Sequence, residues 1–119
     1  MKLAIDLENT LEKKEVFDFA NRLLDEGNEI VVLTARSGHI KSDNNFDIEH
    51  LARSLRISFT DVVFVTDKKS FFENEDNICG YLSDNMIDLQ LCDSVVKTIP
   101  LFGNKNWKSD CLDALNVMV

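Results

Sequence analysis

Two acidic residues near the start of the chain, Asp6 and Glu8, stand two positions apart, directly after an apolar run over 3–5. Carboxylates this close repel each other unless a cation or a shared proton offsets the repulsion. Perturbed carboxylates of this kind are often functional. The pair therefore predicts acid–base chemistry or a divalent-cation site, with a solvated acidic turn as the plain alternative.

A hydroxyl and a guanidinium follow a second apolar run, which covers 29–33. These are Thr34 and Arg36. Both groups suit phosphate oxygens, because the hydroxyl can donate one hydrogen bond and the guanidinium two. Taken alone, each is an ordinary residue for a strand end or a surface.

Lysines and further acids follow two later apolar runs. Lys68 and Lys69 come after the run over 62–65, and Asp84 comes after 78–82, with Asp88 one helical turn further on. A lysine can screen a nucleophilic carboxylate and a transferring phosphoryl group. Carboxylates and a backbone carbonyl are the oxygen ligands that Mg²⁺ takes. Together these residues indicate phosphoryl chemistry at a magnesium site.

The elements that must position these residues are five apolar runs and the helices between them. The runs are rich in Val, Ile and Leu, which favours strands of a buried parallel sheet. The predicted strands cover 2–5, 29–33, 62–65, 78–82 and 95–99.

Helical spacing lies between several of these runs. The clearest case comprises Val16, Phe17, Ala20, Leu23 and Leu24, followed by Gly27 as a stop. A second helix is predicted over 46–57 with Leu55 on its buried face, and shorter ones over 70–72, 86–91 and 109–115. Alternating strands and helices predict an α/β fold, a three-layer sandwich with a mostly parallel five-stranded sheet, whose ligands bind beyond the carboxyl ends of the strands.

Chain length predicts a single domain over 1–119, because 119 residues are too few for a catalytic core plus a second domain that covers the substrate. The polar stretch over 35–45 follows the second strand and is either a substrate loop or a connection. Arg36, His39 and Lys41 are its candidates for substrate contact.

Composition restricts the partners and the compartment. A formal net charge of -8 argues against a long nucleic acid as the binding partner. It is compatible with a small phosphorylated substrate. There is neither an apolar run of about 18 residues nor a secretory signal, so no membrane segment and a cytoplasmic location are expected. Cys79, Cys92 and Cys111 form no metal or redox pattern and are predicted to be buried thiols.

In order, these residues resemble the four motifs of the haloacid dehalogenase superfamily. The motifs are Asp-x-Asp-x-Thr, an apolar strand that ends in Thr or Ser, a Lys, and an acidic motif. The resemblance covers nearly the whole chain and extends to small capless nucleotidase-like and polynucleotide-phosphatase-like members. It implies a Rossmann-like phosphatase fold without a sizeable cap, and magnesium-dependent hydrolysis of phosphate monoesters.

The resemblance also implies a role for each matching residue. Asp6 is the nucleophile that forms an aspartyl-phosphate, Glu8 the general acid and base, and Thr34 the phosphate-binding hydroxyl. Lys68 is the motif lysine, with Lys69 as the alternative and as a substrate contact.

The metal shell implied by the resemblance consists of the Asp6 carboxylate, the Asp84 carboxylate and the backbone carbonyl of Glu8, with Asp88 as a supporting ligand. Arg36 remains a candidate substrate contact because of its place after the second predicted strand. Because no cap is present, the site would be open. An open site and exposed aromatic residues such as Phe71 or Phe72 would allow a homodimer.

Glu8 departs from the family pattern, which has Asp at this position. The extra methylene moves the carboxyl by about a bond length, and misplacements of that order can cost ~100-fold in rate. Three alternatives stay open: Glu8 is a working acid and base, it favours a longer-lived phospho-enzyme, or the domain is a catalytically weak binding or regulatory module.

A phospho-receiver signalling domain also uses Asp, Thr, Lys and magnesium on an α/β fold. In a receiver the phosphorylated Asp follows the third strand and Thr follows the fourth. Here Thr34 follows the second predicted strand, and the acidic motif of Asp84 follows the fourth. The order of the motifs therefore argues against a receiver.

Overall fold

The computed structural model describes residues 1–35, 50, 53–55 and 61–116. Arg36, His39 and Lys41 lie outside the described residues, as does most of the helix predicted over 46–57. Within that segment Leu55 is described and is buried, as predicted.

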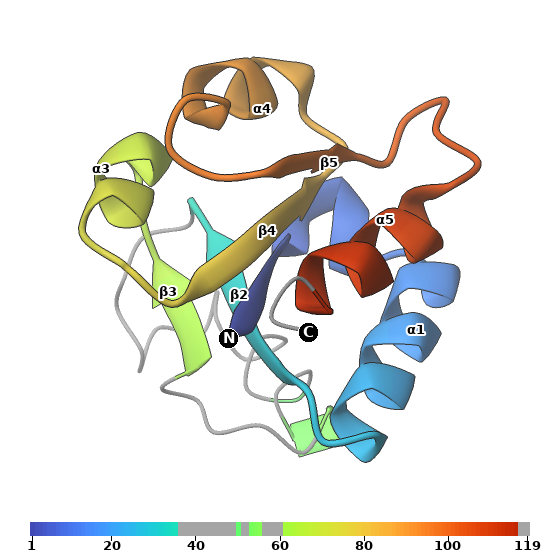
Figure 1. Ribbon diagram of the computed structural model, residues 1–119. Helices are drawn as coiled ribbons and strands as arrows, with labels where there is room; N and C mark the ends of the chain where they lie inside the picture. The colour runs from blue at the N-terminus through green and yellow to red at the C-terminus, as the bar shows by residue number, and fades with distance from the viewer. Residues whose placement is uncertain (36–49, 51–52, 56–60, 117–119) are drawn as a thin grey trace.

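The described elements alternate between strands and helices along the chain (Figure 1). In chain order they are β1 (Lys2–Asp6), the irregular turn η1 (Leu7–Leu11), α1 (Lys14–Asp25), β2 (Glu29–Thr34), β3 (Val62–Phe64), α3 (Lys68–Glu73), β4 (Ile78–Ser83), α4 (Met86–Cys92), β5 (Thr98–Pro100) and α5 (Trp107–Leu115).

The five strands form one sheet in the order β3-β2-β1-β4-β5, and every neighbouring pair is parallel. The predicted α/β class and five-stranded parallel sheet are therefore confirmed. The central strands are apolar almost throughout because both of their faces are covered.

Side chains alternate between two hydrophobic clusters, one on each face of the sheet. Leu3 and Ile5 of β1 belong to one cluster, together with buried residues of α1 and α5. Ala4 belongs to the other, together with buried residues of α3 and α4. Figure 1 accordingly has α1 and α5 on one side of the sheet and α3 and α4 on the other. By the same alternation, Asp6 belongs to the α3–α4 face.

The strand order creates a switch point between β1 and β4. The chain runs from β1 outward through β2 and β3 and then returns to the other side of β1 as β4. In such sheets ligands bind in the crevice beyond the carboxyl ends of the strands at the switch point. Asp6 ends β1 and Ser83 ends β4, so both lie at this crevice. Receiver domains have the order 2-1-3-4-5, which differs from the order found here.

Helix α1 confirms the clearest helical pattern of the sequence. Its buried side chains are Val16, Phe19, Ala20 and Leu23. The helix stops where Gly27 adopts a φ of 88°, a left-handed conformation that glycine adopts without steric cost.

The last strand was predicted too early. It covers Thr98–Pro100, whereas the prediction covered 95–99. The backbone N–H groups of Val95 and Val96 donate to the carbonyl of Cys92 at the end of α4. Their side chains pack against the α3–α4 cluster, so these valines are apolar because they cover that helix end.

The expectation that Phe71 and Phe72 are exposed was wrong for Phe72, which is buried. Its ring packs against Tyr81 at a centroid distance of 4.9 Å, and the half-buried Phe71 packs edge-on against Phe72. Phe72 therefore contributes no exposed aromatic surface, whereas Phe71 remains partly exposed.

The remaining expectations concern thiols and membrane spans, and the single Trp also lies in the core. Cys92 and Cys111 are buried and Cys79 is half-buried, and burial raises the pKa of Cys111 to about 12. Trp107 begins α5 and packs edge-on against Phe19. Among the residues described, none of the helices combines the length and the apolar character needed to span a membrane.

Gly80 allows α5 to approach the middle of β4, which leads to a prediction about stability. A Cβ at this position would lie 3.1 Å from Cδ1 of Ile99 and 3.3 Å from Cβ of Ala114. We expect Gly80→Ala to lower the free energy of unfolding by about 1–2 kcal/mol, because overpacking outweighs the gain in backbone entropy. Urea denaturation measures this.

A double-mutant cycle provides the control. Ala114→Gly removes the α5 atom that lies 3.3 Å away and leaves Cδ1 of Ile99, so the double variant should lose somewhat less stability than the sum of the two single variants. Additive losses would mean that the approach of α5 does not depend on Gly80.

Candidate active site

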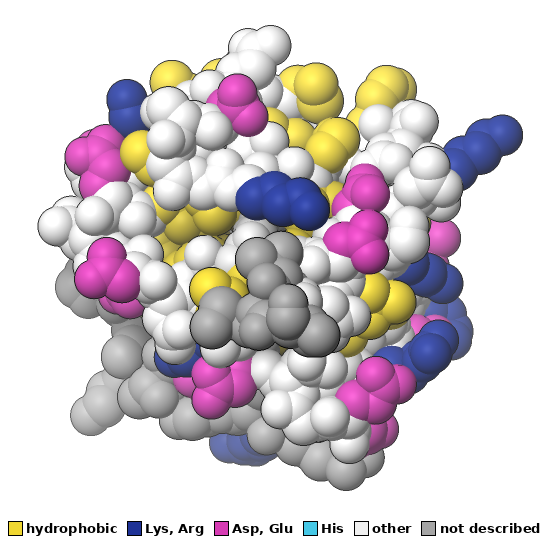
Figure 2. Space-filling model, in the orientation of Figure 1, with side chains coloured by type: hydrophobic (Ala, Val, Ile, Leu, Met, Phe, Trp, Pro, Cys, Tyr) yellow, Lys and Arg dark blue, Asp and Glu magenta, His cyan; other side chains and the backbone are white. Residues whose placement is uncertain are grey.

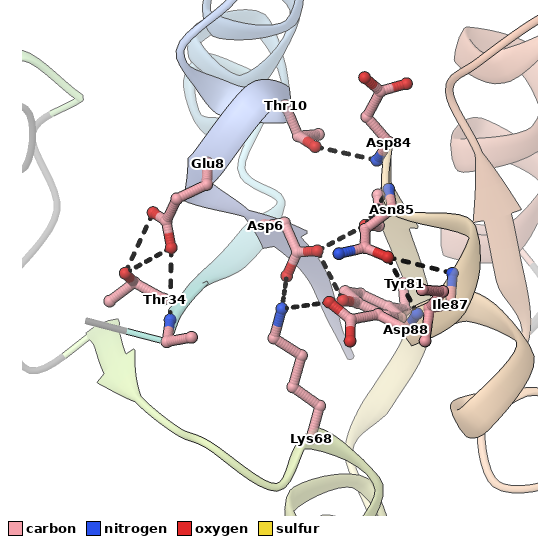
Figure 3. Close-up of polar contacts among 12 residues, drawn as sticks. Asp6, Glu8, Thr10, Thr34, Lys68, Tyr81, Asp84, Asn85, Ile87 and Asp88 are labelled. Atoms are coloured by element: carbon pink, nitrogen blue, oxygen red, sulfur yellow. Dashed lines mark hydrogen bonds and ion pairs between the residues drawn. The ribbon is translucent and has the colours of Figure 1, made fainter. Parts of the chain in front are cut away.

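The site is built at the end of β1, where the chain turns sharply after Asp6. Glu8 remains extended and Asn9 adopts a φ of 58°, a left-handed conformation that Asn tolerates better than most residues. This turn directs the Glu8 side chain toward the end of β2, while Asp6 points toward β4 and α3 (Figure 3).

Asp6 is a buried carboxylate, with only 4% of its surface exposed. Its Oδ2 atom accepts a hydrogen bond of 2.6 Å from the Tyr81 hydroxyl and one of 2.5 Å from the Ser83 hydroxyl. Its Oδ1 atom lies 3.1 Å from Nζ of Lys68. A buried charge must be paired and hydrogen-bonded, and these three groups meet that requirement.

Lys68 joins two carboxylates from different elements. Besides Asp6, its Nζ donates to Oδ2 of Asp88 at 2.8 Å. Burial acts to lower the pKa of Lys68, but the hydrogen bond to Asp88 and the charge of Asp6 outweigh it, and the pKa is raised. The lysine therefore stays charged. Lys69 is exposed, so the structure brings Lys68, and not Lys69, to the carboxylate.

Lys68 reaches Asp6 because it begins α3. The helix starts at Lys68, two residues before the predicted start, and Asp67 caps it by accepting a hydrogen bond from the backbone N–H of Ser70. A capped first turn defines the direction of the first helical side chain.

Glu8 contacts the residue predicted to bind phosphate. Oγ1 of Thr34 donates to Oε1 of Glu8 at 2.8 Å, with Oε2 at 3.1 Å, and the backbone N–H of Ala35 donates to Oε1 at 3.3 Å. The carboxylate thus engages a hydroxyl and an amide, a pair of donors that also suits phosphate oxygens.

Asp84 lies directly after β4 and has one engaged and one unengaged oxygen. Its Oδ2 pairs with Nζ of Lys13 at 3.1 Å, and its backbone N–H donates to Oγ1 of the buried Thr10. Its Oδ1 is buried and accepts no hydrogen bond from the described residues. Oδ1 of Asp6 likewise accepts none, although it has the charge of Lys68 beside it.

Oδ1 of Asp6 and Oδ1 of Asp84 are both buried and accept no hydrogen bond from the described residues, although each carboxylate is also paired with a lysine. Mg²⁺ is typically held by one or two protein carboxylates, with waters and substrate phosphate completing its shell. Within the described residues there is no group of three or more His, Cys, Asp or Glu arranged for a metal. Asp6 and Asp84 are the pocket carboxylates with such an oxygen, but Figure 3 shows the Asp84 carboxylate pointing away from Asp6, while Asp88 pairs with Lys68.

The carboxylates line one pocket with a volume of about 510 Å³. Asp6, Glu8, Lys68 and Asp84 contribute its polar lining, and the first residues of α4 contribute apolar lining. The site can therefore bind a charged group beside a less polar one.

Tyr81 and Ser83 were not predicted as site residues. Strand alternation directs both toward the same face of the sheet as Asp6, and the small Ala4 is the register partner of Tyr81 in β1. The signal available in the sequence was the spacing of two hydroxyl side chains, Tyr81 and Ser83, which stand two positions apart at the end of a predicted strand. Burial and the charge of Asp6 raise the pKa of Tyr81, so the phenol keeps its proton and donates.

Comparison of the chain with protein-family models, with curated proteins and with solved structures found no match.

Proposed function

We propose that the chain is a magnesium-dependent phosphomonoester hydrolase of the haloacid dehalogenase type, which works through an aspartyl-phosphate on Asp6. The observation that carries the proposal is the buried Asp6 carboxylate at the switch point, paired with Lys68 and two residues before Glu8. The strand order, with helices on both faces of the sheet, supports the three-layer arrangement expected for this type.

Two proton transfers by Glu8 complete the proposed reaction. The Asp6 carboxylate attacks phosphorus, the bond to the leaving-group oxygen breaks, and the protonated Glu8 gives its proton to that oxygen. Glu8 then takes a proton from water as the water oxygen attacks phosphorus and the bond between phosphorus and the Asp6 oxygen breaks. This second step releases inorganic phosphate and restores the Asp6 carboxylate.

Three further groups stabilise the charge that moves during these steps. Lys68 screens the repulsion between Asp6 and the phosphoryl oxygens, because its ammonium lies 3.1 Å from the carboxylate. The Thr34 hydroxyl and the Ala35 amide donate to phosphoryl oxygens once Glu8 has left them. Asp88 holds Lys68 in position through their ion pair.

The carboxylates of Asp6 and Asp84 and the backbone carbonyl of Glu8 would hold Mg²⁺. When bound, the ion supplies positive charge that neutralises phosphoryl oxygens. The buried Oδ1 of Asp84 supports this assignment.

The contact between Glu8 and Thr34 also favours a second candidate, a catalytically weak regulatory module. A Glu8 carboxylate that stays on Thr34 and Ala35 would occupy the phosphate donors and block turnover. A shorter Asp side chain would hold these donors less well, so the length of residue 8 separates the two candidates.

The substrate class is a small phosphorylated molecule. Met86 and Ile87 line the pocket and are 49% and 69% exposed, so apolar surface is available beside the phosphoryl site. Figure 2 has hydrophobic side chains over α4, and Asp and Glu lie among Lys and Arg across the face drawn. This mixed surface suits a small molecule better than a polyanion.

The first prediction from the proposed function concerns the nucleophile. Asp6→Asn should lower phosphate release by at least about 1000-fold, because the amide cannot form the acyl phosphate. The assay uses an aryl phosphate and a panel of phosphorylated metabolites, with and without magnesium. The exposed Asp113→Asn on α5 is the matched control for charge and for contaminating phosphatase. Equal turnover by Asp6→Asn and wild type would rule out the mechanism.

The second prediction concerns the metal. Asp84→Asn should weaken Mg²⁺ binding at least about tenfold, because it removes the charge of an oxygen that has no hydrogen-bond donor. Isothermal titration calorimetry measures the affinity without any substrate, and Asp113→Asn again serves as the control. Unchanged affinity would contradict the assigned ligand.

The third prediction concerns Glu8. Glu8→Asp should lower kcat by about 10- to 100-fold, because the site is built around the longer side chain. Glu8→Gln should lose more activity with alkyl than with aryl phosphates, since a poor leaving group needs the proton. A gain in turnover for Glu8→Asp would instead identify the regulatory module.

A further inference from the structure

We infer that Tyr81 is a positioning residue for the proposed nucleophile: together with Ser83 it holds Oδ2 of Asp6 and so fixes the orientation of the carboxylate. This inference rests on the proposed phosphatase function and assigns a role to two residues outside its motifs.

The two oxygens of the Asp6 carboxylate have different surroundings. Oδ2 accepts one hydrogen bond from Tyr81 at 2.6 Å and one from Ser83 at 2.5 Å. Two donors use the two in-plane lone pairs of that oxygen. Oδ1 accepts no hydrogen bond from the described residues and lies 3.1 Å from Nζ of Lys68. Two hydroxyls therefore hold one oxygen and an ammonium lies beside the other, so the carboxylate has one defined orientation in the site.

The position of the Tyr81 hydroxyl is set by packing. Tyr81 is fully buried, and its ring lies 4.9 Å from that of Phe72. Its register partner in β1 is Ala4, whose small side chain leaves room for the ring on this face. A rigid ring in a close-packed environment has little freedom, so the hydroxyl holds the carboxylate in one orientation.

One helix links the two sides of the carboxylate. Lys68 and Phe72 are four residues apart in α3, so they lie on the same face of that helix. Lys68 contacts Oδ1, and Phe72 supports the ring whose hydroxyl contacts Oδ2. Figure 3 shows the carboxylate between Lys68 on one side and Tyr81 on the other.

A buried phenol needs a hydrogen-bond partner in any case, so the contact could also serve stability alone. The two roles differ in what they affect. Loss of a positioning residue lowers the rate of phosphoryl transfer to Asp6 and leaves substrate affinity unchanged. Loss of a purely structural residue lowers the thermal stability and leaves the rate of the folded enzyme unchanged.

The test compares wild type, Tyr81→Phe and Ser83→Ala. Tyr81→Phe keeps the ring and removes only the hydroxyl. Ile99→Val is the control, because Ile99 is buried in the cluster on the opposite face of the sheet and its truncation lowers stability away from the site. Steady-state kinetics with an aryl phosphate and magnesium give kcat and KM. Rapid acid quench gives the rate at which the acyl phosphate forms.

We expect each hydroxyl variant to lower kcat and the rate of acyl-phosphate formation by about 10- to 100-fold, with KM within about twofold of wild type. Ile99→Val should keep the wild-type kcat despite its lower melting temperature. Removing both hydroxyls should cost more than removing either one.

Wild-type rates in folded Tyr81→Phe would overturn the inference, and so would a raised KM with unchanged kcat. If Tyr81→Phe does not fold, Ser83→Ala decides by the same criteria. Wild-type rates, or a raised KM with unchanged kcat, would leave the proposed function intact as long as Asp6→Asn is inactive. Absence of magnesium-dependent turnover in wild type would instead remove the proposed function and this inference together.

Discussion

The desolvation of one carboxylate governs the arrangement of this site. Asp6 is 4% exposed, and a charge buried to that extent is tolerated only with paired charges and donors around it. The compensating groups come from separate elements, since the hydroxyls of Tyr81 and Ser83 belong to β4 and the ammonium of Lys68 to α3. Each of these elements must therefore be in place before the buried carboxylate has its partners.

The parallel sheet brings these elements together. Because β1 lies between β2 and β4 and all three run in the same direction, their carboxyl ends meet at one edge. Thr34, Ser83 and Asp6 end the three strands. The turn after β1 then directs Glu8 away from Asp6 and onto Thr34, which separates the two carboxylates that follow each other so closely in the sequence.

The charges at the pocket are unevenly balanced. Asp6, Asp84 and Asp88 line it, and Lys68 pairs with both Asp6 and Asp88 while Lys13 pairs with Asp84. A surplus of carboxylates in a partly enclosed site favours a divalent cation, and a bound cation reverses the local field for an incoming phosphate. The same surplus explains how a protein with a net charge of -8 can act on an anionic substrate in our proposal.

The sequence by itself determined the features that depend on local pattern. Runs of Val, Ile and Leu predicted the strands, helical spacing predicted α1, and the polar residues after each run predicted Asp6, Thr34 and Asp84 at one edge, because parallel strands end together. Only the tertiary structure decided the choice of Lys68 over Lys69, the contact of Glu8 with Thr34, and the hydroxyls on Asp6. These depend on where α3 begins and on which helix covers which face of the sheet. Both are decided by packing between segments distant in the chain, which no local pattern records.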